Sequence, residues 1–240
     1  MTAATATATG NTSATAPSDH LSILFEPLKM GSLTLPNRFA MAALTRDRCY
    51  PTNVPTDMMV EYYRQRAKGG VGLIISEGIL VEQLGTVYPH APGIWTEEHV
   101  SAWKKITDAV HEEGSRIFAQ LWHVGRCQHN DASERIASGK PIYAPSPIAA
   151  RNGKFRFLPG EPMYSTPLEM SDPNEYIEIF RRAAINAKKA GFDGVEIYAG
   201  GGFLIHTFLD NTSNQRTDQW GGSAKNRARF GLEVVKAVTE

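Results

Sequence analysis

Residues that could bind a small molecule lie where each buried strand of this chain is expected to end. Thr45 follows the first apolar run, Gly78 the second, Gln120 and Trp122 end the third, and Tyr198 ends the fourth. Taken singly, Thr45 could be a cap, Gly78 a turn and Gln120 an ordinary polar residue. The carboxyl ends of parallel strands meet at one face, where binding sites are built. Because all of these residues are expected at this one face, we expect a binding site there.

The chain offers no residue pattern for a metal. His123 has no partner at an HExxH-like spacing, so we interpret it as a hydrogen-bonded structural histidine rather than a base or ligand. Cys49 and Cys127 lie in neither a CxxC nor a Cys/His spacing. We expect no metal site, and the two lone cysteines indicate a reducing compartment.

Apolar runs that alternate with helical patterns are expected to position these residues. The expected strands cover residues 38–44, 72–76, 116–122 and 194–199. Buried strands separated by amphipathic helices are typical of a parallel sheet wrapped by helices. The sequence therefore predicts an α/β fold with four βα units. Residues 123–171, rich in proline and glycine, are expected to form a long loop with room for one hairpin.

Each expected strand precedes a helix with recognisable ends. Thr56 is an N-cap candidate for a helix that stops at Gly69–Gly70. The second helix, residues 96–113, places Val100, Trp103, Ile106 and Val110 on one face. The third opens at the capping box of Asp172, and the fourth begins near Ser223 and continues to Glu240.

Composition limits the partners and the location. The 240 residues carry 25 acidic and 25 basic side chains, so no net field attracts nucleic acid or an anionic membrane. A small molecule is the expected partner. No apolar run approaches a membrane span and no basic targeting segment opens the chain, so we expect a cytosolic protein.

Residues 1–20, rich in alanine and threonine, are expected to be a disordered tail before one domain over residues 21–240.

Several sequence blocks, in order, resemble one flavoenzyme family. They read LFEPLKMGSLTLPNR, EYYRQRA, APGIWTEE, QLWHVGR and SNQRTDQWGGSAKNRARF. Over essentially all of residues 24–240 the chain resembles the old yellow enzyme family. The resemblance implies a (β/α)₈ TIM barrel, of which this chain would carry about the first four βα units, and FMN as the cofactor. It also implies that NADPH or NADH reduces the flavin, which passes hydride to the β-carbon of an α,β-unsaturated carbonyl compound.

The resemblance assigns cofactor-binding roles to five positions. Ala43, Leu44 and Thr45 would contact the isoalloxazine ring, and Thr45 would hydrogen-bond its O4 carbonyl. The family commonly has proline at the Ala43 position. Gly78 would leave room for the flavin edge, and Gln120 would hydrogen-bond the pyrimidine end of the ring.

The catalytic strand departs from the family pattern. There the family reads His-Gly-Ala-Asn-Gly-Tyr-Leu, in which histidine and asparagine donate hydrogen bonds to the substrate carbonyl and tyrosine protonates the α-carbon. Here Tyr198 and Gly201 replace the donor pair and Phe203 replaces the proton donor. Trp122 would be an aromatic residue that can gate the substrate, although tryptophans are more often packing residues. Gly201 can supply no side-chain bond and Phe203 no proton, so the usual mechanism is altered at two points.

Two interpretations stay open. In one, Tyr198 becomes the single donor to a substrate oxygen, or a repositioned proton source, and the loss at Phe203 diverts the reaction from reduction towards, for instance, isomerisation. In the other, Tyr198 is a buried aromatic residue in a non-catalytic binding or scaffold protein that has lost flavin. The intact scaffold around the site favours the enzyme.

A half-barrel would leave two strand edges and one apolar sheet face uncovered. The family's remaining strands, with an arginine near flavin N1 and the phosphate site, would follow Glu240. A shortened sequence, a half that pairs with a copy of itself, and a half that pairs with a complementary chain all stay open. We expect pairing of some kind if the chain is soluble.

Overall fold

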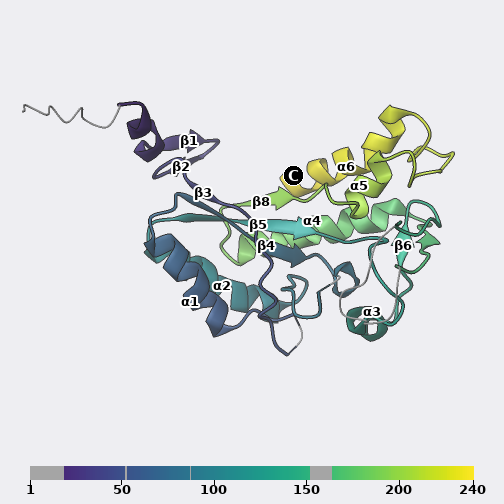
Figure 1. Ribbon diagram of the computed structural model, residues 1–240, viewed down its shortest axis with the longest axis horizontal. Coiled ribbons are helices and arrows are strands. Elements are labelled where there is room, and N and C mark those ends of the chain that lie inside the picture. Colours follow the sequence, from purple (N-terminus) through teal and green to yellow (C-terminus); the bar gives the residue numbers. More distant parts are fainter. Residues whose placement is uncertain (1–18, 52, 87, 152–163) are drawn as a thin grey trace, which may run out of the picture.

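Four parallel strands in chain order form the central sheet of the computed structural model, which describes residues 19–51, 53–86, 88–151 and 164–240. The sheet order is β3-β4-β5-β8. The strands are β3 (Ala40–Met41), β4 (Leu73–Leu80), β5 (Arg116–Trp122) and β8 (Gly194–Ile197). Their arrows point to the right in Figure 1, towards the loops that carry α3, α5 and β6. The expected α/β class with a parallel sheet is confirmed.

Each strand is followed by a helix that covers one side of the sheet. The helices are α1 (Asp57–Lys68), α2 (Glu97–Glu112), α4 (Pro173–Lys189) and α6 (Ala224–Thr239). In Figure 1, α1 and α2 lie side by side at the lower left; α2 also contacts α4, and α4 contacts α6, so the four helices follow one another along the sheet. Their boundaries agree closely with those expected from the sequence, because glycines or capping residues mark them.

Side-chain caps explain three of the four helix starts. Thr96 accepts a hydrogen bond from the His99 N–H and Ser223 one from the Asn226 N–H. Asp172 accepts from the N–H of Asn174, next to the proline in the first turn. Thr56 precedes α1 as expected but does not cap it with its side chain, because its hydroxyl donates to the Arg48 carbonyl.

The two faces of the sheet have different surroundings. Ile117 and Leu121 are fully buried in the core that the strands form with the helices. Side chains alternate along a strand, so Gln120 and Trp122 lie on the opposite face. The ladder places Gly78 opposite Gln120, and Gln120 opposite Glu196. Three neighbouring strands therefore present these residues in one line across the second face.

Two strand lengths differ from the expectation. The first strand pairs over only Ala40–Met41 rather than residues 38–44. Beyond it, the backbone N–H of Arg46 donates to the Glu77 carboxylate. The second extends to Leu80 rather than ending at Ser76, through an irregularity between Ile75 and Gly78.

Short elements complete the described chain. The loop after β5 contains α3 (Ser133–Ser138), β6 (Tyr143–Ala144) and β7 (Leu168–Glu169). Because β6 and β7 pair in parallel, this pair is not the expected hairpin. Residues 152–163 of the same loop lie outside the described residues. The short helices η2 (Gln83–Gly85) and α5 (Leu204–Leu209) were not expected, because six residues or fewer show too little periodicity.

The amino-terminal part holds a 3₁₀ helix and a hairpin. The helix η1 (Asp19–Phe25) begins inside the expected tail, so that expectation is wrong for residues 19–20, and residues 1–18 lie outside the described residues. β1 (Leu28–Met30) and β2 (Leu33–Leu35) form an antiparallel hairpin around Gly31. No helix in the described part of the chain is long and apolar enough to cross a membrane.

Candidate functional site

The indole of Trp122 lies against Gly78 at the carboxyl ends of β4 and β5. A Cβ atom added at Gly78 would lie 2.7 Å from two ring carbons of Trp122, closer than such atoms approach in proteins. Glycine at this position therefore lets a large ring cover the end of β4. The two residues, which the sequence placed at separate strand ends, form one contact.

Three further rings join Trp122. The centroid of the Trp122 ring lies 6.2 Å from the ring centroid of Tyr198 and 5.2 Å from that of Phe203. The ring centroids of Tyr198 and Phe203 are 5.4 Å apart. Tyr88 stacks on Trp122 with nearly parallel planes at 5.9 Å. The structure thus brings together the three predicted aromatic residues and adds Tyr88, which sequence reasoning missed. We call Tyr88, Trp122, Tyr198 and Phe203 the aromatic cluster.

Tyr198 and Gly201 are sterically matched. A Cβ atom added at Gly201 would lie 2.8 Å from the Tyr198 hydroxyl oxygen. Gly201 also has φ of 62°, in the left-handed region that favours glycine. The hydroxyl of Tyr198 therefore occupies the space in which a side chain at position 201 would begin.

Two hydrogen-bond donors of the aromatic cluster lack partners. The Trp122 indole N–H is buried and has no acceptor within the described part of the chain. No hydrogen bond is made by the half-buried Tyr198 hydroxyl in the same residues. An unsatisfied buried donor costs about 1–3 kcal/mol.

Gln120 is held by a residue that the sequence reasoning did not single out. Its Nε2 donates to Oε1 of Glu196 at 2.7 Å across the β5–β8 ladder. Gln120 is almost fully buried, whereas Glu196 is exposed. Because the amide nitrogen is used in this bond, the amide oxygen is the group of Gln120 left to accept a hydrogen bond from a ligand. The alternation of the strand could have identified Glu196.

Glu77 anchors the segment that contains the predicted residues Ala43, Leu44 and Thr45. Its Oε2 accepts the backbone N–H of Arg46 at 3.0 Å, and the Tyr63 hydroxyl contacts both its carboxylate and its N–H. The Glu77 side chain is buried, and burial raises its pKa from 4.5 to about 7. One buried carboxyl group thus ties the segment after β3 to the residue that precedes Gly78.

The three residues of that segment differ in exposure. Ala43 and Thr45 are half-buried, whereas Leu44 is 52% exposed. A large apolar side chain this exposed at the end of a strand is available to contact a ligand ring. The structure places the segment beside β4 through the β3–β4 pairing.

His123 is a structural residue, as expected. Its Nδ1 accepts the Gly125 N–H, so its Nε2 carries the proton that is donated to Glu82 at 3.0 Å. Burial alone would raise the pKa of Glu82, but hydrogen bonds from His123 and Lys140 lower it to about 2. The ring therefore joins the loop after β5 to Glu82 through hydrogen bonds at both of its nitrogens.

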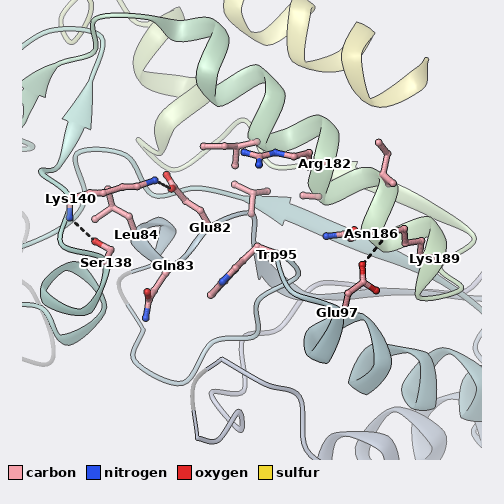
Figure 2. A pocket seen from close by; sticks show the side chains of 14 residues that line it. Glu82, Gln83, Leu84, Trp95, Glu97, Ser138, Lys140, Arg182, Asn186 and Lys189 are labelled. Carbon is pink, nitrogen blue, oxygen red and sulfur yellow. Dashed lines mark hydrogen bonds and ion pairs between the residues drawn. The ribbon is translucent and has the colours of Figure 1, made fainter.

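A cavity of about 590 Å³ lies beside this ion pair, between α4 and the β4–α2 loop. Figure 2 shows Glu82 and Lys140 at one end and Glu97 and Lys189 at the other, with Trp95 between them. None of the predicted site residues lines it. Its lysines are paired with glutamates, so it presents few free groups for chemistry. No cluster of metal ligands occurs in the described residues.

Comparisons with known proteins identify close relatives. A family model described as the NADH:flavin oxidoreductase / NADH oxidase family matches residues 23–240. The chain is 44% identical over 220 residues to 12-oxophytodienoate reductase 7 of Oryza sativa subsp. japonica, covering 90% of this chain and 54% of that protein. It is 40% identical over 237 residues to a probable flavin mononucleotide-dependent alkene reductase of Leishmania infantum, covering 94% and 62%.

Solved structures are similar too. Morphinone reductase superposes with a TM-score of 0.81 at 43% identity, covering 90% of this chain and 58% of that one. An old yellow enzyme homologue from Zymomonas mobilis gives a TM-score of 0.82 at 41% identity, covering 90% and 59%. The chain thus spans little more than half the length of these proteins.

Glu77 should make stability depend on pH. Its pKa is higher in the folded protein, about 7, than its usual 4.5, so its stabilising effect is complete below pH 4.5 and is lost as the pH rises to about 7. Over that interval the free energy of unfolding should fall by about 1 kcal/mol per pH unit relative to Glu77→Gln. Urea unfolding at several pH values measures this. The exposed Glu61→Gln is the control, and parallel curves for Glu77→Gln and the wild type would contradict the assignment.

The match between Tyr198 and Gly201 can be tested by a double-mutant cycle. Gly201→Ala should destabilise the wild type by about 1–3 kcal/mol, because the new methyl group meets the hydroxyl oxygen. In a Tyr198→Phe background the cost should be about 1 kcal/mol smaller. Gly200→Ala is the control, because its Cβ would be 3.7 Å from the same oxygen. Equal costs of Gly201→Ala in both backgrounds would refute the match.

Proposed function

The chain belongs to the NADH:flavin oxidoreductase / NADH oxidase family, and from this we propose that it is part of an FMN-dependent oxidoreductase that reduces a conjugated carbonyl compound. One observation carries the proposal: a tyrosine hydroxyl, that of Tyr198, which has no hydrogen-bond partner among the described residues, lies in an aromatic cluster on the edge of the sheet where Gly78 and Gln120 lie. Such an arrangement can bind a flat ring and polarise a carbonyl oxygen. Relatives named as alkene and oxophytodienoate reductases support it.

FMN is the cofactor of this family, and NADH or NADPH is the reductant. The residues present fit the flavin ring. The exposed Leu44, with Ala43, supplies apolar contact, whereas the space beside Gly78 is filled by the Trp122 indole rather than left open for the ring as expected. Thr45 and the free amide oxygen of Gln120 supply polar contacts. When bound, the flavin supplies the hydride, and these residues orient it.

Tyr198 would hold the substrate oxygen as negative charge develops on it. Removing one donor from such a site typically raises the activation barrier by about 3–4 kcal/mol. A single hydroxyl in place of the usual two donors should therefore leave the reaction slower. Trp122 would pack against the substrate, and Gly201 leaves the hydroxyl in place. Phe203 cannot donate a proton, so water must deliver the proton to the α-carbon of the substrate.

We propose that the sheet represents the first four βα units of a (β/α)₈ barrel and that further strands cover its open face. Among the described residues the outer edges of β3 and β8 pair with no strand. Relatives of nearly twice the length support a further polypeptide segment as the cover. For the chain alone, association with a second copy is the alternative way to cover this face.

We also propose a cytosolic location, because Cys49 and Cys127 are free, buried thiols.

The purified chain should take up FMN, become yellow and bleach on addition of NADPH or NADH. Gln120→Leu should weaken FMN binding several-fold, because it removes one hydrogen bond. Gln65→Leu, on the exposed side of α1, is the matched control. Flavin fluorescence on titration measures the affinity. A folded, colourless protein that binds no added FMN would support the non-catalytic alternative instead.

The chain alone should not be a monodisperse monomer. Exposed strand edges and an uncovered sheet face favour association with a copy or with a complementary chain. Light scattering coupled to size exclusion measures the mass, for which the monomer value is 26.4 kDa. A single species at that mass would contradict the proposed cover.

A further inference from the structure

Glu77 fastens the far end of the segment after β3, residues 42–46. The β3–β4 ladder ends at Met41, so strand pairing does not hold the residues beyond it. The backbone N–H of Arg46 donates to Oε2 of Glu77 at 3.0 Å, and this bond closes the segment at its carboxyl end. Glu77 is 1% exposed, so water does not compete for the carboxylate oxygen. The position of the segment therefore depends on this carboxyl group.

Tyr63 of α1 sets the orientation of the Glu77 carboxyl group. The Tyr63 hydroxyl accepts the backbone N–H of Glu77 at 2.8 Å and donates to Oε1 at 3.4 Å. Tyr63 is fully buried, and burial raises the pKa of its hydroxyl well above the ordinary value, so it stays a neutral donor. Each carboxyl oxygen of Glu77 thus has its own donor, one from α1 and one from the segment after β3.

Glu77 changes its charge near neutral pH. Burial and the negative charge of Asp47 raise the pKa of Glu77 to about 7, against the hydrogen bonds from Arg46 and Tyr63. Burial also raises the pKa of Asp47, and it raises that of the neighbouring Cys49 thiol, which stays neutral. An ionised carboxylate accepts a hydrogen bond about twice as strongly as a neutral carboxyl group. Ionisation of Glu77 therefore strengthens its bond to the Arg46 N–H.

We propose that Glu77 is a positioning residue for the flavin. Its carboxylate holds the segment after β3 in the arrangement that contacts the ring, and protonation of the carboxylate loosens that segment. This inference rests on the proposed function, because it takes Ala43, Leu44 and Thr45 as flavin contacts. A segment that is already ordered binds a ligand more tightly, since less conformational entropy is lost on binding. Flavin affinity should therefore rise as Glu77 ionises.

Stability and flavin affinity should respond to this ionisation with opposite signs. Burial favours the neutral carboxyl group in the folded protein, so the free energy of unfolding falls as the pH rises to about 7. The hydrogen bond to the Arg46 N–H gains strength over the same interval. A residue that only stabilised the fold would make flavin affinity fall together with stability.

Titration of the chain with riboflavin at several pH values tests the proposal, with flavin fluorescence as the measurement. Riboflavin is the probe because it lacks the phosphate group of FMN, whose second pKa is about 6. Between about pH 5.5 and about pH 8.5 the affinity should rise about three- to tenfold, with a midpoint near 7. Affinity that is constant or falls over this range would overturn the inference.

Three variants assign the dependence to Glu77. Glu77→Gln cannot ionise, so its riboflavin affinity should stay constant at the value of the wild type at low pH. Tyr63→Phe removes a donor to the carboxylate, which should move the midpoint to higher pH. Asp47→Asn is the control, because asparagine also tolerates the φ of 52° at this position. Its dependence should persist with a lower midpoint, since a neighbouring negative charge is removed. Loss of the dependence in Asp47→Asn, or its persistence in Glu77→Gln, would contradict the assignment.

Hydrogen exchange of the Arg46 amide supplies a readout that needs no flavin. Measured by NMR and corrected for the intrinsic rate at each pH, its protection should rise about three- to tenfold in the wild type and stay constant in Glu77→Gln. The Gly93 amide, which donates to the Asn53 carbonyl at 2.8 Å, is the control and should show no such rise in either protein. Constant protection of Arg46 in the wild type would overturn the inference.

The outcomes separate the two levels of the argument. A folded chain that binds neither riboflavin nor FMN overturns the proposed function and this inference with it. A chain that binds riboflavin equally well at every pH overturns the inference alone.

Discussion

The register of the parallel sheet is the constraint on which the rest of this structure depends. It sets Gly78, Gln120 and Glu196 opposite one another on three neighbouring strands. A shift of one residue would turn these side chains to the helical face and expose the core in their place. The site exists because the core side chains of the opposite face, such as Ile117 and Leu121, fix that register by burial.

Large rings and glycines are paired at the ends of the strands. Trp122 lies on Gly78, and the Tyr198 hydroxyl occupies the space next to Gly201. In each pair the ring has its position because its partner lacks a side chain. Substitutions at such positions are therefore coupled, so an altered catalytic strand can be read as a repacked site rather than as independent losses.

Helices were well predicted from the sequence, whereas the residues that support the site were not. Capping residues and an apolar face define α2 and α4 locally, within a few turns of chain. Glu77 could not be recognised, because its partners Arg46 and Tyr63 lie far from it in sequence. The stacking of Tyr88 on Trp122 likewise depends on how the loop before α2 meets the end of β5.

The sequence by itself determined the fold class, the family and which residues end the strands, because periodicity, caps and motifs are local properties of the chain. Only the tertiary structure decided that Tyr198 fills the space beside Gly201, that Glu196 holds Gln120, and that a buried Glu77 anchors the segment around Thr45. The second and third contacts join residues on different strands and loops, and the first depends on how the chain turns after β8. Their geometry depends on register and side-chain volume, which a linear pattern does not contain.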